Sequence, residues 1–464
     1  MTNRIRDTAS IVAVGLALAW ITPAQAQTAT SVAEELAQMR AQMERMAERI
    51  DQLEGQLAQA RASATAATTA ASEAKVAATE ASKPTAAQIA WKGAPEFTSK
   101  DGFNFEPRGR LQLDAGAVSR PDGITDKSTG FGTEVRRAYI GFDGTLPGGF
   151  GYRAEIDVAG SASIDVTDLY LTYAASKEVT LTLGQHKPFW GLEEITSDLF
   201  TSFTERAAMN TAFGNERRLG ASLAYAKGPV LVQAGMFTDN VNDLNASDEN
   251  NSWSSDARAV FMPKLGDGQL HFGASVHHRE LKDSASGVRY RVRPPIHTPD
   301  IRFIDTGVVN ASAETGYGLE FAYLSGRFHA TSEHRWQRVI RPGGPNPIFL
   351  GGYAEVGYFL TKGDKRGYKK GNFNRTRPAN PVGKDGIGAI ELNLRYDRLD
   401  LSDAGIVGGK QNGYQIGLVW TPTDYTRFML NYGRMNYSDA FLPAAGGDRS
   451  YGVDAFGARA QFDF

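Results

Sequence analysis

Hydrophobic and polar residues alternate along most of this chain, from about residue 96 to its end. In the run GFGYRAEIDVAG, every second residue from Phe150 to Val158 is apolar, and charged residues lie between them. In AIELNLRYD, the apolar residues from Ile390 to Tyr396 alternate with polar ones. Side chains of a β-strand point alternately to its two faces, so this period predicts two-sided strands. We predict sixteen strands: 104–118, 132–147, 149–159, 164–175, 179–188, 217–227, 229–238, 253–263, 268–280, 313–325, 327–340, 350–362, 386–399, 410–421, 424–436 and 450–464.

The connections between these strands alternate in length. Five are tight turns: 147–149, 176–178, 227–229, 325–327 and 422–424. Most of the others are long, notably 189–216 and 281–312. Short turns at one end, long loops at the other and an even strand number are typical of outer-membrane barrels. A soluble β-sandwich also alternates, but its strands are usually shorter. The pattern predicts an all-β fold, a 16-stranded antiparallel transmembrane β-barrel over 96–464.

The chain begins with the features of a secretory signal. Arg4 and Arg6 precede a short apolar run at 11–21, and small residues stand at Ala24 and Ala26. These features predict a signal peptide over 1–26 and export from the cytoplasm. A short membrane anchor is the alternative.

The next segment has a helical period. Apolar residues follow one another at alternating steps of four and three: Val32, Leu36, Met39, Met43, Met46, Ile50, Leu53 and Leu57. This heptad spacing predicts a periplasmic α-helical coiled coil over 27–60, and therefore an oligomer. A single amphipathic helix lying on a domain would show the same spacing. Residues 61–95 are rich in Ala and Thr and are predicted to be a linker, partly helical or disordered.

Composition excludes several functions. The 50 basic and 52 acidic residues nearly balance, which argues against a nucleic-acid partner. The chain has no cysteine, so disulfides and thiolate chemistry are impossible. Seven His are scattered, and no catalytic or metal-binding motif accompanies them. We therefore expect no enzyme, no metal and no cofactor. An outer-membrane lipid hydrolase would need Ser and His on one outer face, and no convincing pair is found.

Several motifs resemble one known family when taken in order. They are RRAYIGFDGTL, VTDLYLTY, LGQHKPFWGLEE, YGLEFAY, GYFLTKGDKRGYKK, AIELNLRYDRLDL and MLNYGRMNY. Each is weakly specific, but the ordered set over about 97–464 is similar to the phosphate-selective porin O and P family. The resemblance implies a homotrimeric sixteen-stranded channel in the bacterial outer membrane, in contact with lipid and lipopolysaccharide. It also implies small inorganic anions, phosphate or polyphosphate above all, as solutes.

One predicted long loop carries arginine at every second position. The stretch RYRVRP places Arg289, Arg291 and Arg293 on one side of an extended segment, and Arg302 follows in the same loop. Porins of this family fold long loops into the lumen, so the resemblance implies that these arginines bind anions there. A guanidinium binds phosphate in a bidentate way and keeps its charge. A solvated external loop, or a loop that binds lipopolysaccharide phosphates, is the alternative.

A second basic cluster occupies a turn on the opposite side, at 362–384. Its basic residues are Lys362, Lys365, Arg366, Lys369, Lys370, Arg375, Arg377 and Lys384. A turn of this length is unexpected at the short-turn end, and by resemblance it would fold into the channel. There it would focus the field and enrich anions. A solvated turn or a docking patch for a periplasmic partner is the alternative.

Strand parity places further arginines on the lumen side. Arg137 and Arg153 oppose the apolar face, and the pair Arg136–Arg137 resembles a family anion site. The loop 189–216 departs from a strict phosphate pore because five acidic residues stand against Arg206: Glu193, Glu194, Asp198, Glu205 and Glu216. A general anion porin, a sugar-acid porin and a structural tether acting through the coiled coil therefore remain as alternatives.

Overall fold

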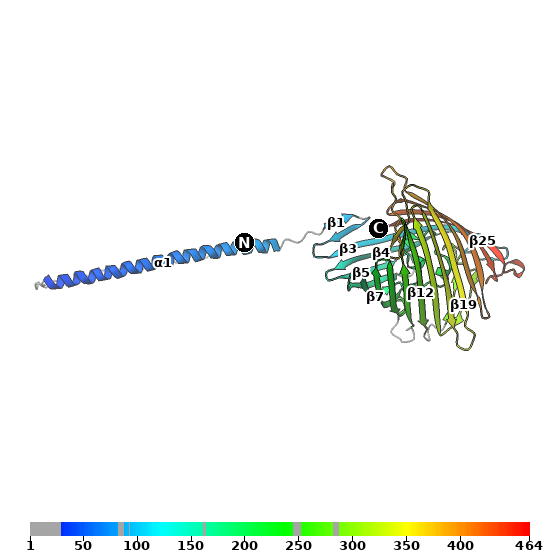
Figure 1. Cartoon of the computed structure of the whole chain (residues 1–464), viewed down its shortest axis with the longest axis horizontal. Helices are drawn as coiled ribbons and strands as arrows, with labels where there is room; N and C mark the ends of the chain where they lie inside the picture. The colour runs from blue at the N-terminus through cyan, green and yellow to red at the C-terminus, as the bar shows by residue number, and fades with distance from the viewer. Residues whose placement is uncertain (1–28, 82–87, 92, 161–163, 245–251, 282–286) are drawn as a thin grey trace. The chain divides into compact units, whose positions relative to one another are not determined.

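The computed structural model describes residues 29–81, 88–91, 93–160, 164–244, 252–281 and 287–464. The predicted signal peptide lies outside these residues. Within them, sixteen long antiparallel strands form a closed barrel (Figure 1). The barrel strands are β3 (Asn104–Val118), β4 (Gly130–Leu146), β5 (Phe150–Asp157), β6 (Asp165–Ala174), β7 (Val179–His186), β8 (Arg218–Lys227), β9 (Val230–Phe237), β10 (Trp253–Phe261), β12 (Gly268–Glu280), β17 (Ala313–Ser325), β18 (Phe328–Ile340), β19 (Ile348–Phe359), β22 (Ala389–Asp403), β23 (Ile406–Thr423), β24 (Thr426–Ser438) and β25 (Tyr451–Asp463).

Each barrel strand pairs with its neighbour along the chain, and the last strand returns to the first. β25 pairs with β3 from Ala455↔Val118 to Asp463↔Arg110, which leaves no open edge. Closure satisfies the backbone hydrogen bonds of every strand, as a membrane interior requires. The sixteen predicted strands are confirmed. β22 and β23 are longer than predicted because they meet at a two-residue turn, Ala404–Gly405, whose residues both have positive φ.

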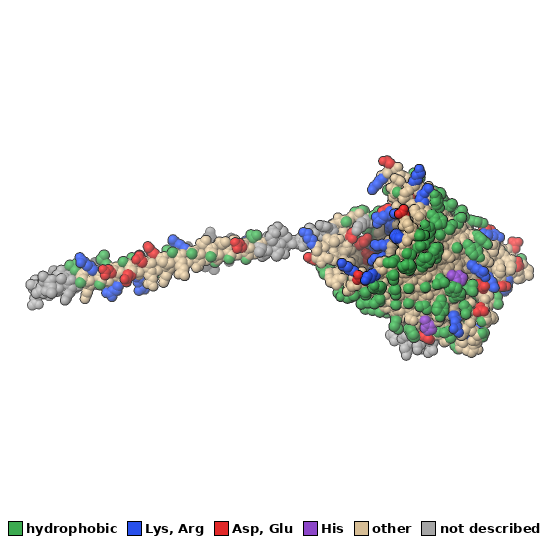
Figure 2. All heavy atoms as spheres, in the orientation of Figure 1, with side chains coloured by type: hydrophobic (Ala, Val, Ile, Leu, Met, Phe, Trp, Pro, Cys, Tyr) green, Lys and Arg blue, Asp and Glu red, His purple; other side chains and the backbone are tan. Residues whose placement is uncertain are grey.

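The two faces of the barrel differ in polarity as the alternation predicts. On β22, Leu394 and Tyr396 are exposed on the outside, whereas Glu391, Arg395 and Asp397 are buried inside. Figure 2 shows the outer surface as a broad hydrophobic area, with basic and acidic side chains gathered in the barrel mouth beside it. Such an apolar outer band and polar interior match a transmembrane barrel.

A hydrophobic core lies inside the barrel at its long-loop end. It joins Tyr290 and Val292 of the loop after β12 to Met209 of the loop after β7 and to wall residues such as Leu399 and Val453. The loop after β12 contains β13 (Gly287–Val288), β14 (Arg291–Val292), β15 (Ile304–Asp305) and β16 (Val309–Asn310), paired as β13–β16 and β14–β15. Apolar burial therefore holds two long loops within the lumen.

The loop after β7 crosses the interior of the barrel. It contains α2 (Leu192–Ile195), the 3-10 helix η1 (Asp198–Phe200) and α3 (Ala208–Ala212). Its Trp190 is fully buried and donates its indole N–H to the carbonyl of Phe213 at 3.1 Å. Two backbone N–H groups of α2, at Leu192 and Glu193, donate to the carboxylate of Glu333 on β18 at 2.9 and 2.8 Å. The wall thus fixes the start of this loop.

The turn between β19 and β22 also folds against the inner wall. It forms a small hairpin of β20 (Gly367–Lys369) and β21 (Asn372–Asn374). The hairpin tip, Lys370–Gly371, has positive φ at both residues, as a type I′ turn requires. Arg258 on β10 donates to the carbonyl of Gly371 at 3.0 Å, and Tyr368 contacts His271 on β12 at 2.7 Å.

Three further features lie outside the barrel strands. Helix α1 (Ala29–Ala81) belongs to a separate unit and runs on through 61–81, the first part of the segment 61–95 that we predicted to be a linker, partly helical or disordered. β1 (Gln88–Trp91) pairs with β2 (Pro95–Thr98), which pairs with β3; β11 (Lys264–Leu265) pairs with β12, and η4 spans Ala445–Gly447. Among the described residues, no helix combines the length and apolarity needed to cross a membrane.

The internal core can be tested with Phe303→Ala. Phe303 is fully buried between the rings of Tyr437 and Tyr451, with centroids 5.0 and 5.8 Å away. We expect the free energy of unfolding in detergent to fall by about 3–5 kcal/mol because a large buried side chain is lost. Trypsin cleavage at the arginines of the loop after β12 should become faster in the folded barrel. Phe131→Ala, on an exposed ring, is the control. An unchanged cleavage rate in Phe303→Ala would contradict the internal core.

Candidate functional site

Two β-bulges turn extra side chains toward the lumen. On β3 and β4, Gln112 pairs with Arg137 and Leu113 pairs with Val135, so Arg136 is an extra residue. A bulge interrupts the alternation of side chains, which lets Arg136 and Arg137 both face inward. A second bulge lies on β6, where Thr167 is the extra residue. Without the bulges, strict alternation would place either Arg136 or Arg137 on the outer face, and likewise either Thr167 or its neighbour.

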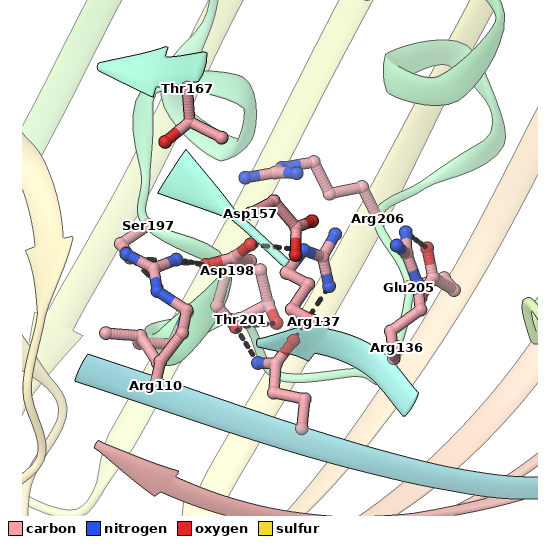
Figure 3. A network of polar contacts seen from close by, with 12 residues as sticks. Arg110, Arg136, Arg137, Asp157, Thr167, Ser197, Asp198, Thr201, Glu205 and Arg206 are labelled. Atoms are coloured by element: carbon pink, nitrogen blue, oxygen red, sulfur yellow. Dashed lines mark hydrogen bonds and ion pairs between the residues drawn. The ribbon is translucent and has the colours of Figure 1, made fainter. Parts of the chain in front are cut away.

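Asp198 of the crossing loop pairs with two arginines of the wall. Its carboxylate contacts Arg110 on β3 and the Nε of Arg137 on β4, the latter at 2.6 Å (Figure 3). Ser197 caps η1 by accepting the N–H of Leu199. Burial alone would raise the pKa of Asp198, but Arg110 and Arg137 outweigh burial and hold that pKa well below its usual range. Asp198 is therefore ionised at neutral pH.

Glu205 forms a second anchor of the same kind. Its Oε1 lies 3.0 Å from Arg136 Nε and 3.0 Å from Arg459 Nη2 on β25. Arg459 also forms a bidentate pair with Asp114 on β3, with both distances at 2.7 Å. Burial alone would raise the pKa of Glu205, but Arg136 and Arg459 hold it well below its usual range. Figure 3 shows Glu205 and Arg136 together beside the Asp198 cluster.

The remaining buried acids of the loop also have cationic partners. Glu193 lies 2.5 Å from Arg395 Nη2 on β22, and Glu194 lies 3.1 Å from Lys187 Nζ. Burial, followed by the nearby Arg206, lowers the pKa of Lys187 to about 8. Three acids of this loop, Glu193, Asp198 and Glu205, are thus counter-ions for arginines of the wall, whereas Glu194 pairs within the loop. Neither Lys187 nor Glu333 was predicted to anchor the loop. For Glu333, the alternation of strand residues could have indicated an inward-facing carboxylate.

A cavity of about 460 Å³ lies between the two inward loops and the wall. Seven arginines and four acidic residues line it. The arginines are Arg136, Arg137, Arg206, Arg289, Arg291, Arg293 and Arg302. This excess of positive charge makes the cavity attractive to anions.

The arginines and apolar residues alternate in RYRVRP because the segment lies between the internal core and this cavity. Val288, Tyr290 and Val292 are buried in the internal core, so the arginines between them face the cavity. Arg289 pairs with Asp305 at 2.6 Å. Arg293 and Arg302 share Asp300, at 2.7 and 3.2 Å. The side chain of Arg291 is exposed and has no hydrogen-bonded or ionic partner among the described residues.

A second cavity of about 780 Å³ adjoins the first. Six basic and six acidic residues line it, so its formal charges balance. Arg153 lies here, and its guanidinium pairs with Asp143 at 2.6 Å and lies 3.8 Å from Asp168. The two cavities share Arg137, Glu194 and Arg206 among their lining residues.

The predicted basic turn divides into two groups. Arg366 is buried 3.7 Å from Glu391, Arg375 pairs with Asp463, and Arg377 lies 3.6 Å from Asp424. These arginines have carboxylate partners on the wall or the neighbouring turn. The lysines are exposed and have no ion pair among the described residues: Lys362, Lys365, Lys369, Lys370 and Lys384.

A closed antiparallel barrel with an apolar outside and a charged, incompletely filled lumen defines an outer-membrane channel. The chain belongs to the phosphate-selective porin O and P family, whose model matches residues 105–464. The family and the barrel indicate a channel rather than an enzyme. Within the described residues, no group of three His, Asp or Glu could hold a metal ion.

Curated relatives and solved structures agree with this family. An uncharacterized protein of Caulobacter vibrioides is 47% identical over 395 residues, which cover 83% of this chain and 79% of that protein. Porin O of Pseudomonas aeruginosa is 27% identical over 423 residues, which cover 81% of this chain and 92% of Porin O. The trimer form of in-vitro folded OmpT, an outer-membrane protein of Vibrio cholerae, has a TM-score of 0.50 at 11% identity; the match covers 78% of this chain and 100% of OmpT. That structure is similar in fold alone.

The anchoring of the crossing loop can be tested with Asp198→Asn over a range of pH. The variant leaves Arg110 and Arg137 without their shared carboxylate, and we expect the free energy of unfolding at pH 7 to fall by about 3–5 kcal/mol. The folded pKa of Asp198 is lowered, so this stabilisation is complete above about pH 5 and is lost as the pH falls below about 4.

Thermal unfolding midpoints of the wild type and the variant, from pH 7 to pH 2, measure this effect. Their difference should be constant down to about pH 5 and should shrink in more acidic solution. Asp267→Asn, at an exposed turn, is the control. No difference at pH 7, or a difference at pH 2 as large as that at pH 7, would contradict the anchor.

Proposed function

We propose that this protein is a passive diffusion channel for small anions. The observation that carries the proposal is the cavity between the inward loops, where seven arginines stand against four acidic residues. Two of those acids, Glu194 and Glu205, already have basic partners. The surplus positive charge would enrich anions in the narrow part of the lumen.

Within that cavity, Arg291 is the proposed primary anion contact because it has no counter-ion among the described residues. Arg289, Arg293 and Arg302 have carboxylate partners, so an incoming anion must compete with those carboxylates. Several weak sites in succession allow an ion to enter and also to leave. Phosphate or polyphosphate is the proposed solute class, since the family is described as phosphate-selective and a relative is Porin O.

The other basic residues have secondary roles in this proposal. Three arginines line the lumen but form ion pairs with carboxylates: Arg136, Arg137 and Arg153. Their chief role is therefore to hold the wall and the crossing loop in shape. The lysines of the turn after β19 would attract anions electrostatically. The balanced charges of the larger cavity favour one alternative, a general anion porin of weak selectivity that also passes sugar acids.

The proposed channel can be tested in a planar bilayer. The wild-type protein should give an anion-selective reversal potential in a KCl gradient, and added phosphate should block the chloride current. Arg291→Ala should raise the half-blocking phosphate concentration about tenfold, the effect of losing one charge-assisted hydrogen bond. Lys227→Ala, at the exposed end of β8, should leave both values unchanged.

Each alternative has its own result in that experiment. Anion selectivity without phosphate block would support the general anion porin. A cation-selective wild type would refute the proposed function. Equal phosphate block in the wild type and Arg291→Ala would refute the role of Arg291.

We further propose a homotrimer in the bacterial outer membrane, with helix α1 in the periplasm as a coiled coil. Lipid would surround the apolar outer surface, and lipopolysaccharide would contact the long-loop end. The apolar side chains of α1 are exposed in the single chain, from Leu36 to Leu57. A 53-residue helix that exposes such a seam also favours a second role, that of a tether to the cell wall.

The heptad positions continue past the segment that we predicted as a coiled coil. After Leu57, the same positions are filled by Ala60, Ala64, Ala67, Ala71 and Ala74. The charges beside the seam fit parallel copies in register, since Glu35 of one copy would face Arg40 of the next, and Arg49 would face Glu54. We therefore propose that the copies associate along most of α1, with the helices closer together over the alanine half.

Single cysteines can test this proposal because the natural chain has none. In the full-length protein, Ala71→Cys lies on the seam and Thr69→Cys lies on the opposite face. Mild oxidation should link chains of Ala71→Cys and leave Thr69→Cys largely unlinked. Ile50→Cys marks the first half of the seam. Crosslinking of Ile50→Cys without Ala71→Cys would restrict the coiled coil to 27–60, and crosslinking of neither would refute it.

A further inference from the structure

Glu216 is the last acidic residue of the crossing loop and directly precedes Arg217 and β8. It lines the 460 Å³ cavity, the 780 Å³ cavity and a third cavity of about 240 Å³. A side chain that lines all three lies where the internal spaces meet. Its carboxylate is therefore open to solutes in each of these spaces.

Glu216 differs from the other four acids of this loop. Glu193, Glu194, Asp198 and Glu205 each have a basic partner and are largely buried. The side chain of Glu216 is exposed, and within the described part of the chain it makes neither a hydrogen bond nor an ion pair. The other four carboxylates help to hold the loop in place through ion pairs, whereas the carboxylate of Glu216 forms no such pair among the described residues.

The same cavity contains a basic side chain in the same condition. The side chain of Arg291 is exposed and without a partner among the described residues, and it lines the 460 Å³ cavity together with Glu216. The free carboxylate and the free guanidinium do not pair with each other, and both charges are open to solutes that enter this cavity. Each charge can form a charge-assisted hydrogen bond.

We propose that Glu216 and Arg291 form a mixed-charge site that favours solutes carrying both an anionic group and an ammonium group. The anionic group, a phosphate or a carboxylate, contacts Arg291, and the ammonium group contacts Glu216. This inference rests on the proposed anion channel and specifies which of its solutes are held best. For a solute without a cationic group, the carboxylate of Glu216 is repulsive and reduces its passage.

Two solutes that differ mainly in the ammonium group can test the site. O-Phosphoethanolamine carries a phosphate and an ammonium, whereas ethyl phosphate carries the phosphate alone. In planar bilayers, O-phosphoethanolamine should half-block the wild-type chloride current at a concentration about threefold lower, the Coulomb effect of one unit charge at close range in water. Glu216→Gln should remove this difference and raise the chloride-to-potassium permeability ratio by about threefold.

Asp267→Asn is the matched control because it removes one exposed carboxylate that lines none of the three cavities. It should behave as the wild type. Equal block of the wild type by the two solutes would overturn the mixed-charge site and leave the anion channel intact. The inference is also overturned if Glu216→Gln keeps the difference or if Asp267→Asn abolishes it. A cation-selective wild type that neither solute blocks would instead refute the channel proposal itself.

Discussion

The pairing of loop carboxylates with wall arginines is the interaction on which the interior of this barrel depends. Sixteen strands enclose more space than their inward side chains can fill. In this barrel the loop after β7 crosses that space, and its buried charges must be matched there. Asp198 and Glu205 meet arginines from β3, β4 and β25 and fix the crossing loop. That loop then presents Met209 to the internal core, and the core positions the loop after β12.

The loop after β12 shows how one segment serves packing and solute contact together. Tyr290 and Val292 are buried against α3 and the wall, while Arg289, Arg291 and Arg293 face the cavity. An extended backbone is the conformation that separates these two sets by residue parity. The apolar half supplies the rigidity that the arginine half needs, because long arginine side chains lose less freedom on binding when their backbone is already fixed.

Sequence alternation predicted the barrel well because each strand's pattern is local and repeats sixteen times. The alternation failed where a bulge adds a residue to β4. It predicted that Arg137 faces inward but gave no reason for Arg136 to face inward as well. It also described the loop after β7 as acidic without revealing that Asp198 and Glu205 are counter-ions, since their partners lie far away in sequence. The composition of 61–81 indicated a linker, although its alanines occupy heptad positions in a continuous helix.

The place of Arg459 has a consequence for the order of assembly. Arg459 lies on the last strand, and it contacts Asp114 on the first strand and Glu205 on the crossing loop. The complete Glu205 site therefore exists only after β25 has joined β3. In a barrel still open between β25 and β3, Asp114 and Glu205 would both lack Arg459, so these two contacts form only when the fold is complete.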